Sequence, residues 1–131
     1  MEITARPGAD ADRRRAILER WYRAQLKHDL APLLSKWETA IGVKTASWGV
    51  RKMRTRWGSC NPKAKRLWFN LELAKKSLDC LEYVVVHELI HLLERRHDAR
   101  FKELMTKHLP EWRSIRESLN AAPLGQEPRE L

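Results

Sequence analysis

The sequence His87-Glu88-Leu89-Ile90-His91 contains residue types and a spacing that can support metal chemistry. Two histidines four positions apart lie on one face of a helix, about 6 Å apart along its axis, which suits two nitrogens that bind one zinc ion. Glu88 lies about 100° further round the helix, so it can reach a water molecule beside the metal without binding the metal. A glutamate in that place acts as a general base. The motif therefore predicts a zinc-dependent hydrolase.

The residues around this motif strengthen that interpretation. A shuffled chain of the same composition would contain the five-residue pattern in roughly 2% of cases, so the pattern needs support. The predicted helix is apolar on nearly every side, as buried helices are, through Val84, Val85, Val86, Leu89, Ile90, Leu92 and Leu93. Burying two histidines and a glutamate is costly unless a partner satisfies them. A metal ion would do so; the alternative is a pair of hydrogen-bonded core histidines.

A catalytic zinc site needs a third protein ligand and an open fourth position. His97 follows His91 by six residues, the spacing in the metzincin pattern His-Glu-x-x-His-x-x-Gly-x-x-His. Glu94 stands where that pattern has glycine, so we expect Arg95-Arg96 to end the helix and turn His97 back.

Two acidic residues further along, Glu103 and Glu111, are rival third ligands. We favour His97 because a short loop can place it and Asp98 can cap the next helix beside it. The remaining histidines are most simply surface or packing residues: His28 and His108.

The rest of the chain supplies the elements that must position this site. Apolar residues recur at helical spacing over residues 12–41, which predicts one long helix, or two that break near Pro32, ending at Gly42. Residues 45–56 and 66–71 read as strands, with a turn over residues 58–63, so we expect an antiparallel hairpin.

Helical spacing returns after Ser77. Ser77 or Asp79 could cap a helix over residues 81–93, Asp98 could cap the next one, and Pro110 opens a last helix. We therefore expect an α+β chain with a flexible arm over residues 1–10, one domain over residues 11–120 and a disordered tail over residues 121–131.

The composition narrows the function classes. The net charge of +9 and pI near 10 favour anionic partners, including nucleic acid and nucleotides, although basic surfaces also serve solubility. No stretch is apolar for long enough to span a membrane, and the N-terminus lacks a signal-peptide pattern, so we expect a cytoplasmic enzyme. We expect free thiols at Cys60 and Cys80, because one pair cannot form a disulfide framework.

Four segments together resemble the YgjP-like metallopeptidase domain family. They are Arg54-Thr55-Arg56-Trp57-Gly58-Ser59-Cys60, Leu67 to Leu73, Leu81 to Leu92 and His97 to Phe101. The chain is also similar, more distantly, to the SprT-like and WLM zinc proteases, and the resemblance covers about residues 15–120.

This resemblance implies a small zincin-like α+β fold, and the predicted hairpin gives it a short antiparallel sheet. It also implies a metallopeptidase with His87, His91 and His97 as zinc ligands and Glu88 as base. Ser77 stands where relatives commonly have proline ahead of the active-site helix.

The strand before the predicted turn could border the cleft, which makes Arg54 and Arg56 candidates for substrate binding. Arg56 could hold an acidic substrate group or a developing oxyanion, or be only a charge-paired neighbour of Trp57. We interpret Trp57 as a core residue.

Two other functions remain open. The basic loops over residues 51–66 could hold phosphates for nucleotide hydrolysis, although no glycine-rich phosphate loop supports it. A protease recruited to DNA, as SprT-like relatives are, is the other alternative, and it predicts salt-dependent binding through Arg13–Arg15 or Lys63–Arg66. The sequence leaves the oligomeric state undetermined.

Overall fold

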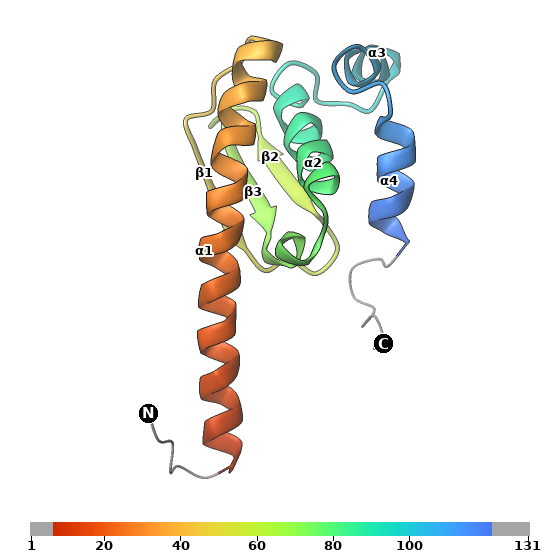
Figure 1. The fold of residues 1–131 in the computed structure, drawn as a ribbon. Helices are drawn as coiled ribbons and strands as arrows, with labels where there is room; N and C mark the ends of the chain where they lie inside the picture. Colours follow the sequence, from red (N-terminus) through yellow and green to blue (C-terminus); the bar gives the residue numbers. More distant parts are fainter. Residues whose placement is uncertain (1–6, 122–131) are drawn as a thin grey trace.

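The structure, a computed structural model, describes residues 7–121. It is an α+β fold in which α2 lies at the centre, with α1 on one side and α3 and α4 on the other (Figure 1). In chain order the elements are α1 (Pro7–Ile41), β1 (Ser47–Arg51), β2 (Gly58–Asn61), β3 (Arg66–Asn70), the 3-10 helix η1 (Leu71–Lys75), α2 (Leu78–Ile90), α3 (Ala99–His108) and α4 (Trp112–Asn120). No helix within residues 7–121 combines the length and apolar character that crossing a membrane requires.

The first helix is continuous and contains Pro32 in its interior. Pro32 has no N–H to donate to the turn before it, but buried Leu30 and Leu34 hold the helix against the core on both sides of the proline. The helix ends where predicted, with Gly42 at φ 84° and its N–H donating to the Glu38 carbonyl. Its start differs from the prediction, because residues 7–10 of the expected arm are helical. Residues 1–6 and 122–131 lie outside the described residues.

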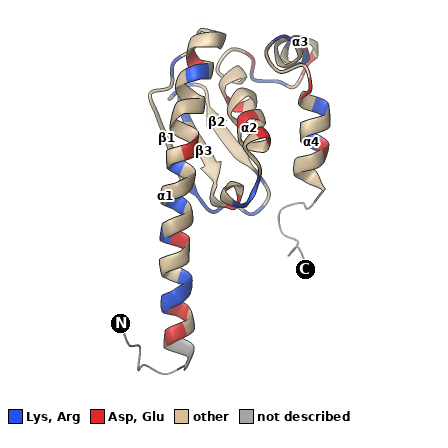
Figure 2. Ribbon diagram, in the orientation of Figure 1, with Lys and Arg blue, Asp and Glu red and all other residues tan. Residues whose placement is uncertain are grey.

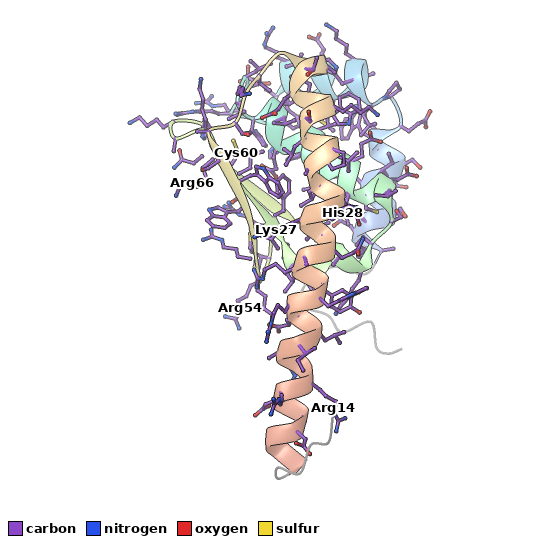
Figure 3. The ribbon with its side chains drawn as sticks, turned by 60° about the vertical axis from the view of Figure 1, so that its left-hand side comes forward. Arg14, Lys27, His28, Arg54, Cys60 and Arg66 are labelled. Atoms are coloured by element: carbon purple, nitrogen blue, oxygen red, sulfur yellow. The ribbon has the colours of Figure 1, made fainter. Side chains whose placement is uncertain are left out.

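The N-terminal part of α1 extends beyond the body of the domain (Figure 1). Contact with the body begins at an ion pair between Glu19 and Lys52 and at Arg23, whose Nη1 donates to the Val50 carbonyl at 2.8 Å. The extending part carries both basic and acidic residues, and Arg14 projects from it (Figures 2 and 3). The Arg13–Arg15 cluster is therefore exposed and distant from the packed core.

The sheet differs from the predicted hairpin. Its strand order is β1-β3-β2; β2 pairs with β3 antiparallel, whereas β1 pairs with β3 in parallel, with Val50 opposite Phe69. The turn expected over residues 58–63 is wrong for its first four residues, because Gly58–Asn61 is strand. The turn covers residues 62–65, and its last residue, Lys65, has φ 52°. A short turn closes the β2–β3 hairpin at low entropic cost, and β1 pairs with the other edge of β3.

The predicted buried helix is confirmed, and nine of the thirteen residues of α2 are buried, including Glu88. Ser77 caps it by accepting from the Cys80 N–H, so α2 begins three residues before the predicted start at Leu81. The helix ends at Ile90, earlier than predicted, and the chain turns from His91 onward. His91, the last residue of the motif, therefore lies just after the end of the regular helix.

Candidate metal centre and cleft

Three histidines converge where α2 ends. His87 lies in the last turn of α2, His91 follows its end, and His97 comes from the turn that leads into α3. Their Nε2 atoms form a triangle, with 3.2 Å between His87 and His91, 3.0 Å between His91 and His97, and 3.1 Å between His97 and His87. Asp98 fixes the next helix by accepting from the Phe101 N–H at 3.0 Å, as predicted.

The triangle suits a shared metal ion. Nitrogens bound tetrahedrally to zinc at 2.0–2.1 Å lie about 3.3 Å apart, close to the observed spacing. His91 Nδ1 lies 3.0 Å from the Glu94 carbonyl oxygen, and because a carbonyl only accepts, that nitrogen carries the ring proton and Nε2 keeps its lone pair. Burial lowers the pKa of His87 to about 3 and also lowers that of His91. Both rings are therefore neutral near pH 7, the state that binds metals.

The rival ligands lie elsewhere. Within the described chain, the one group of three or more His, Cys, Asp or Glu side chains placed to share an ion is the histidine triad. Glu103 borders a separate hollow on α3, and Glu111 is exposed before α4. His28 is exposed on α1, as Figure 3 shows, and His108 packs edge-on against Trp37. Both therefore have the surface and packing places expected of them.

Phe101 supports all three imidazoles from behind. This residue of α3 is 2% exposed, and its ring centroid lies 4.9, 4.7 and 4.8 Å from those of His87, His91 and His97. Tyr83, one turn before His87, brings its hydroxyl to 3.5 Å from His87 Nδ1. A buried apolar ring and a hydroxyl thus restrict the orientations of the histidine rings.

Glu88 faces the same cavity as the histidines and is 5% exposed. Burial raises its pKa to about 8, and the positive charge of Arg56 acts in the opposite direction. Gly58 of β2 leaves room for the carboxylate, because a methyl group there would lie 3.1 Å from Glu88 Oε2 and 2.9 Å from Val84 Cγ1. The glycine thus lets a strand approach the helix closely beside the proposed base.

The cavity beside these residues has a volume of about 620 Å³. Helix α2 contributes Glu88 and the motif histidines, β2 and the residues before it form one wall, and α4 lines the other wall. The two walls are joined by Trp57, whose Nε1 donates to Asn120 Oδ1 at 3.1 Å. Trp57 therefore packs partly against the core, as predicted, and also lines the cleft.

The two predicted substrate-binding arginines separate. Arg56 lines the cavity, whereas Arg54 is exposed at the end of the sheet and is absent from the lining (Figure 3). Asn70, which is fully buried at the end of β3, fixes the loop that carries Arg56. Its Nδ2 donates to the Met53 carbonyl at 2.9 Å and to the Arg56 carbonyl at 2.7 Å, and its Oδ1 accepts from the Glu72 N–H at 3.0 Å.

Comparison with known proteins decides the family. The sequence model of the YgjP-like metallopeptidase domain matches residues 2–122, nearly the whole chain. The chain belongs to this family. Membership makes it a metal-dependent peptidase and implies a catalytic metal.

Two solved structures share the fold. One is the metallopeptidase zymogen abylysin of Pyrococcus abyssi, with 18% identity and a TM-score of 0.65 over 70% of this chain and 92% of that chain. The other is the metallopeptidase zymogen jannalysin of Methanocaldococcus jannaschii, with 18% identity and a TM-score of 0.61 over 69% and 92% of the respective chains. None of the curated proteins compared with the chain matches it.

Several residues of the site escaped the sequence interpretation. Phe101 was named only as the end of a segment that resembles the family, and Arg116 on α4 lines the cleft although no motif marks it. Asn70 carried a usable signal, because a polar residue within the apolar run Leu67 to Leu71 must find buried partners.

Cys60 lines the cavity too, but burial raises the pKa of its thiol to about 12, so it stays protonated. Cys60 and Cys80 are both free, as predicted.

Proposed function

We propose that this metallopeptidase is zinc-dependent, with His87, His91 and His97 as ligands and Glu88 as general base. The observation that carries the proposal is the triangle of Nε2 atoms at 3.0–3.2 Å beside one buried glutamate in a single cavity. Three imidazoles favour zinc by ligand type and availability. Three protein ligands also leave one position of a tetrahedral ion for water or substrate, as catalytic zinc sites require.

The chemistry divides between the metal and the chain. A bound zinc ion would polarise the peptide carbonyl and make an adjacent water molecule more acidic. Glu88 then takes a proton from the attacking water and later donates it to the leaving amine nitrogen. Burial, which raises the pKa of this carboxyl group, favours the protonated form that donates to the leaving amine.

The sheet offers a place for a polypeptide substrate. Strand β2 is an edge strand, because it pairs only with β3 among the described strands, and its residues Gly58, Ser59 and Cys60 line the cavity. An extended peptide can add to such an edge by main-chain hydrogen bonds. Arg56, at the same wall, is placed to bind a substrate carboxylate or the oxyanion that forms during cleavage.

Two substitutions test this assignment. Glu88→Gln should retain stoichiometric zinc and lose at least about 10²-fold in peptide hydrolysis, because it removes only the base. His97→Ala should lose zinc, whereas His28→Ala, a matched change at an exposed histidine of α1, should keep both zinc and activity. Metal content would be measured by inductively coupled plasma mass spectrometry. Retained turnover in Glu88→Gln would refute the role of this residue.

A further inference from the structure

Three arginines surround the cleft, and each comes from a different part of the fold. Arg56 precedes β2, Arg95 lies in the turn after α2, and Arg116 belongs to α4; all three line the cavity. Arg56 and Arg116 thus lie on opposite walls of the cavity, and Arg95 lies beside the histidines.

We call Arg56, Arg95 and Arg116 the arginine ring. No acidic side chain among the described residues neutralises it. None of the three forms an ion pair within the described residues, although other basic residues do, such as Arg100 with Glu94. Glu88 is the one acidic side chain that lines the cavity, and it is buried. All three side chains are exposed at the cavity, so their positive charges attract anions to it.

The rest of the cavity indicates which anion. Beside the arginines stand the open edge of β2 and apolar side chains including Val84 and Leu119. An open strand edge binds extended polypeptide, whereas a polyphosphate usually needs a glycine-rich loop or a helix N-terminus. Helix α4 presents its C-terminal end to this cavity, at Leu119 and Asn120. The surroundings therefore favour a peptide over a nucleotide.

We propose that this peptidase selects acidic polypeptide segments, in which Asp or Glu side chains next to the cleaved bond bind the arginine ring. Arginine binds a carboxylate through two parallel hydrogen bonds, and each such contact is stronger in a hollow than on an open surface. The proposal rests on the proposed function for the cleavage step, but its binding step is independent of Glu88.

Matched peptides test the preference. Two internally quenched peptides with blocked ends would differ only in carrying Glu or Gln on both sides of the central bond. The zinc-loaded enzyme should cleave the Glu peptide with a kcat/KM about tenfold higher or more in 50 mM salt, and the preference should shrink in 300 mM salt. Equal cleavage of both peptides, or a preference that appears only when the C-terminus is free, would overturn the proposal.

Substitutions locate the preference. Arg116→Gln, Arg95→Gln and Arg56→Gln should each lower the ratio of Glu-peptide to Gln-peptide kcat/KM by about three- to tenfold. Arg113→Gln and Arg96→Gln are matched controls, and they should keep the wild-type ratio within about twofold. Arg113 stacks on Trp112 as Arg116 does, but it borders the other hollow, and Arg96 is exposed beside Arg95 without lining the cleft. A ratio that responds equally to controls and ring variants would refute the assignment.

A binding measurement separates this proposal from the catalytic one. Fluorescence anisotropy with Glu88→Gln, in zinc-loaded and metal-free forms, should show tighter binding of a labelled Glu peptide than of its Gln counterpart. If peptides bind with this preference but are never cleaved by the wild type, the proposed function fails and the acidic preference stands. If both peptides are cleaved equally and Glu88→Gln is inactive, the reverse holds. Binding of ATP that is tighter than that of the Glu peptide, and lost on Arg116→Gln, would assign the ring to phosphates instead.

Discussion

Replacing Asn70 by alanine should destabilise the whole domain, although Asn70 touches neither the histidines nor Glu88. Its amide supports the segment between β1 and β2 through the carbonyls of Met53 and Arg56, and it accepts from the Glu72 N–H. The backbone N–H of Asn70 also donates to the Trp57 carbonyl, and that bond would survive the substitution.

The magnitude follows from the three bonds that disappear. Each hydrogen bond contributes about 1 kcal/mol net, so Asn70→Ala should lower the free energy of unfolding by about 3 kcal/mol. Asn70 is fully buried, which means that water does not replace the lost partners easily. Asn70→Asp keeps the side-chain volume but replaces two N–H donors with an oxygen that faces two carbonyls. It should therefore lower the free energy of unfolding by at least as much.

Urea denaturation followed by tryptophan fluorescence would measure the effect. With a denaturant dependence of about 2 kcal/mol per molar urea, the midpoint should fall by about 1.5 M. Asn61→Ala is the matched control, because Asn61 Oδ1 accepts a single hydrogen bond from the Ala64 N–H in an exposed turn, and the midpoint of this variant should fall by less than about 0.5 M. Equal shifts for the two variants would show that the buried amide does not hold this loop.

Three further outcomes are expected. Gly58→Ala should reduce kcat at least about tenfold with zinc content unchanged, because the new methyl group displaces the Glu88 carboxylate; unchanged kcat would contradict this. Phe101→Ala should weaken zinc binding about tenfold or more in a competition with a chelating dye and destabilise the domain by about 3 kcal/mol, and unchanged affinity would exclude its supporting role. In the metal-free protein the urea midpoint should fall as pH rises from 6.5 to 8, because folded Glu88, with its pKa raised to about 8, binds a proton that the unfolded chain has released. Between pH 4.5 and 6.5 the lowered pKa values of His87 and His91 have the opposite effect, so the midpoint should not fall there, and Glu88→Gln should abolish the fall above pH 6.5.

The sequence predicted best what depends on neighbours along the chain. The convergence of His87, His91 and His97 follows from helical spacing and one short turn, and the caps at Ser77 and Asp98 lie where side-chain chemistry places them. The continuous apolar character of α2 predicted its burial for the same reason. In each case the deciding interaction joins residues within about three helical turns.

The features that the sequence did not predict depend on pairing between distant segments. The alternation of apolar residues over residues 45–56 indicates a strand but does not determine its direction, so the parallel pairing of β1 with β3 was missed. Arg116 and Phe101 gain their roles only when α4 and α3 fold back on α2. Pro32 shows the converse, because tertiary packing of α1 overrides a local preference to break the helix.

The proposed ligands are close together along the chain, so assembly of the metal site and assembly of the cleft are separate events in folding. His87 and His97 are only ten positions apart, so bringing them together closes a short loop and has a small entropic cost. The cleft walls have much higher contact order, because Trp57 meets Asn120 across 63 positions. Metal uptake therefore reports the formation of α2, the turn after it and the packing of Phe101, whereas peptide cleavage reports the complete fold. A destabilised variant can thus retain its metal and still lack a substrate cleft.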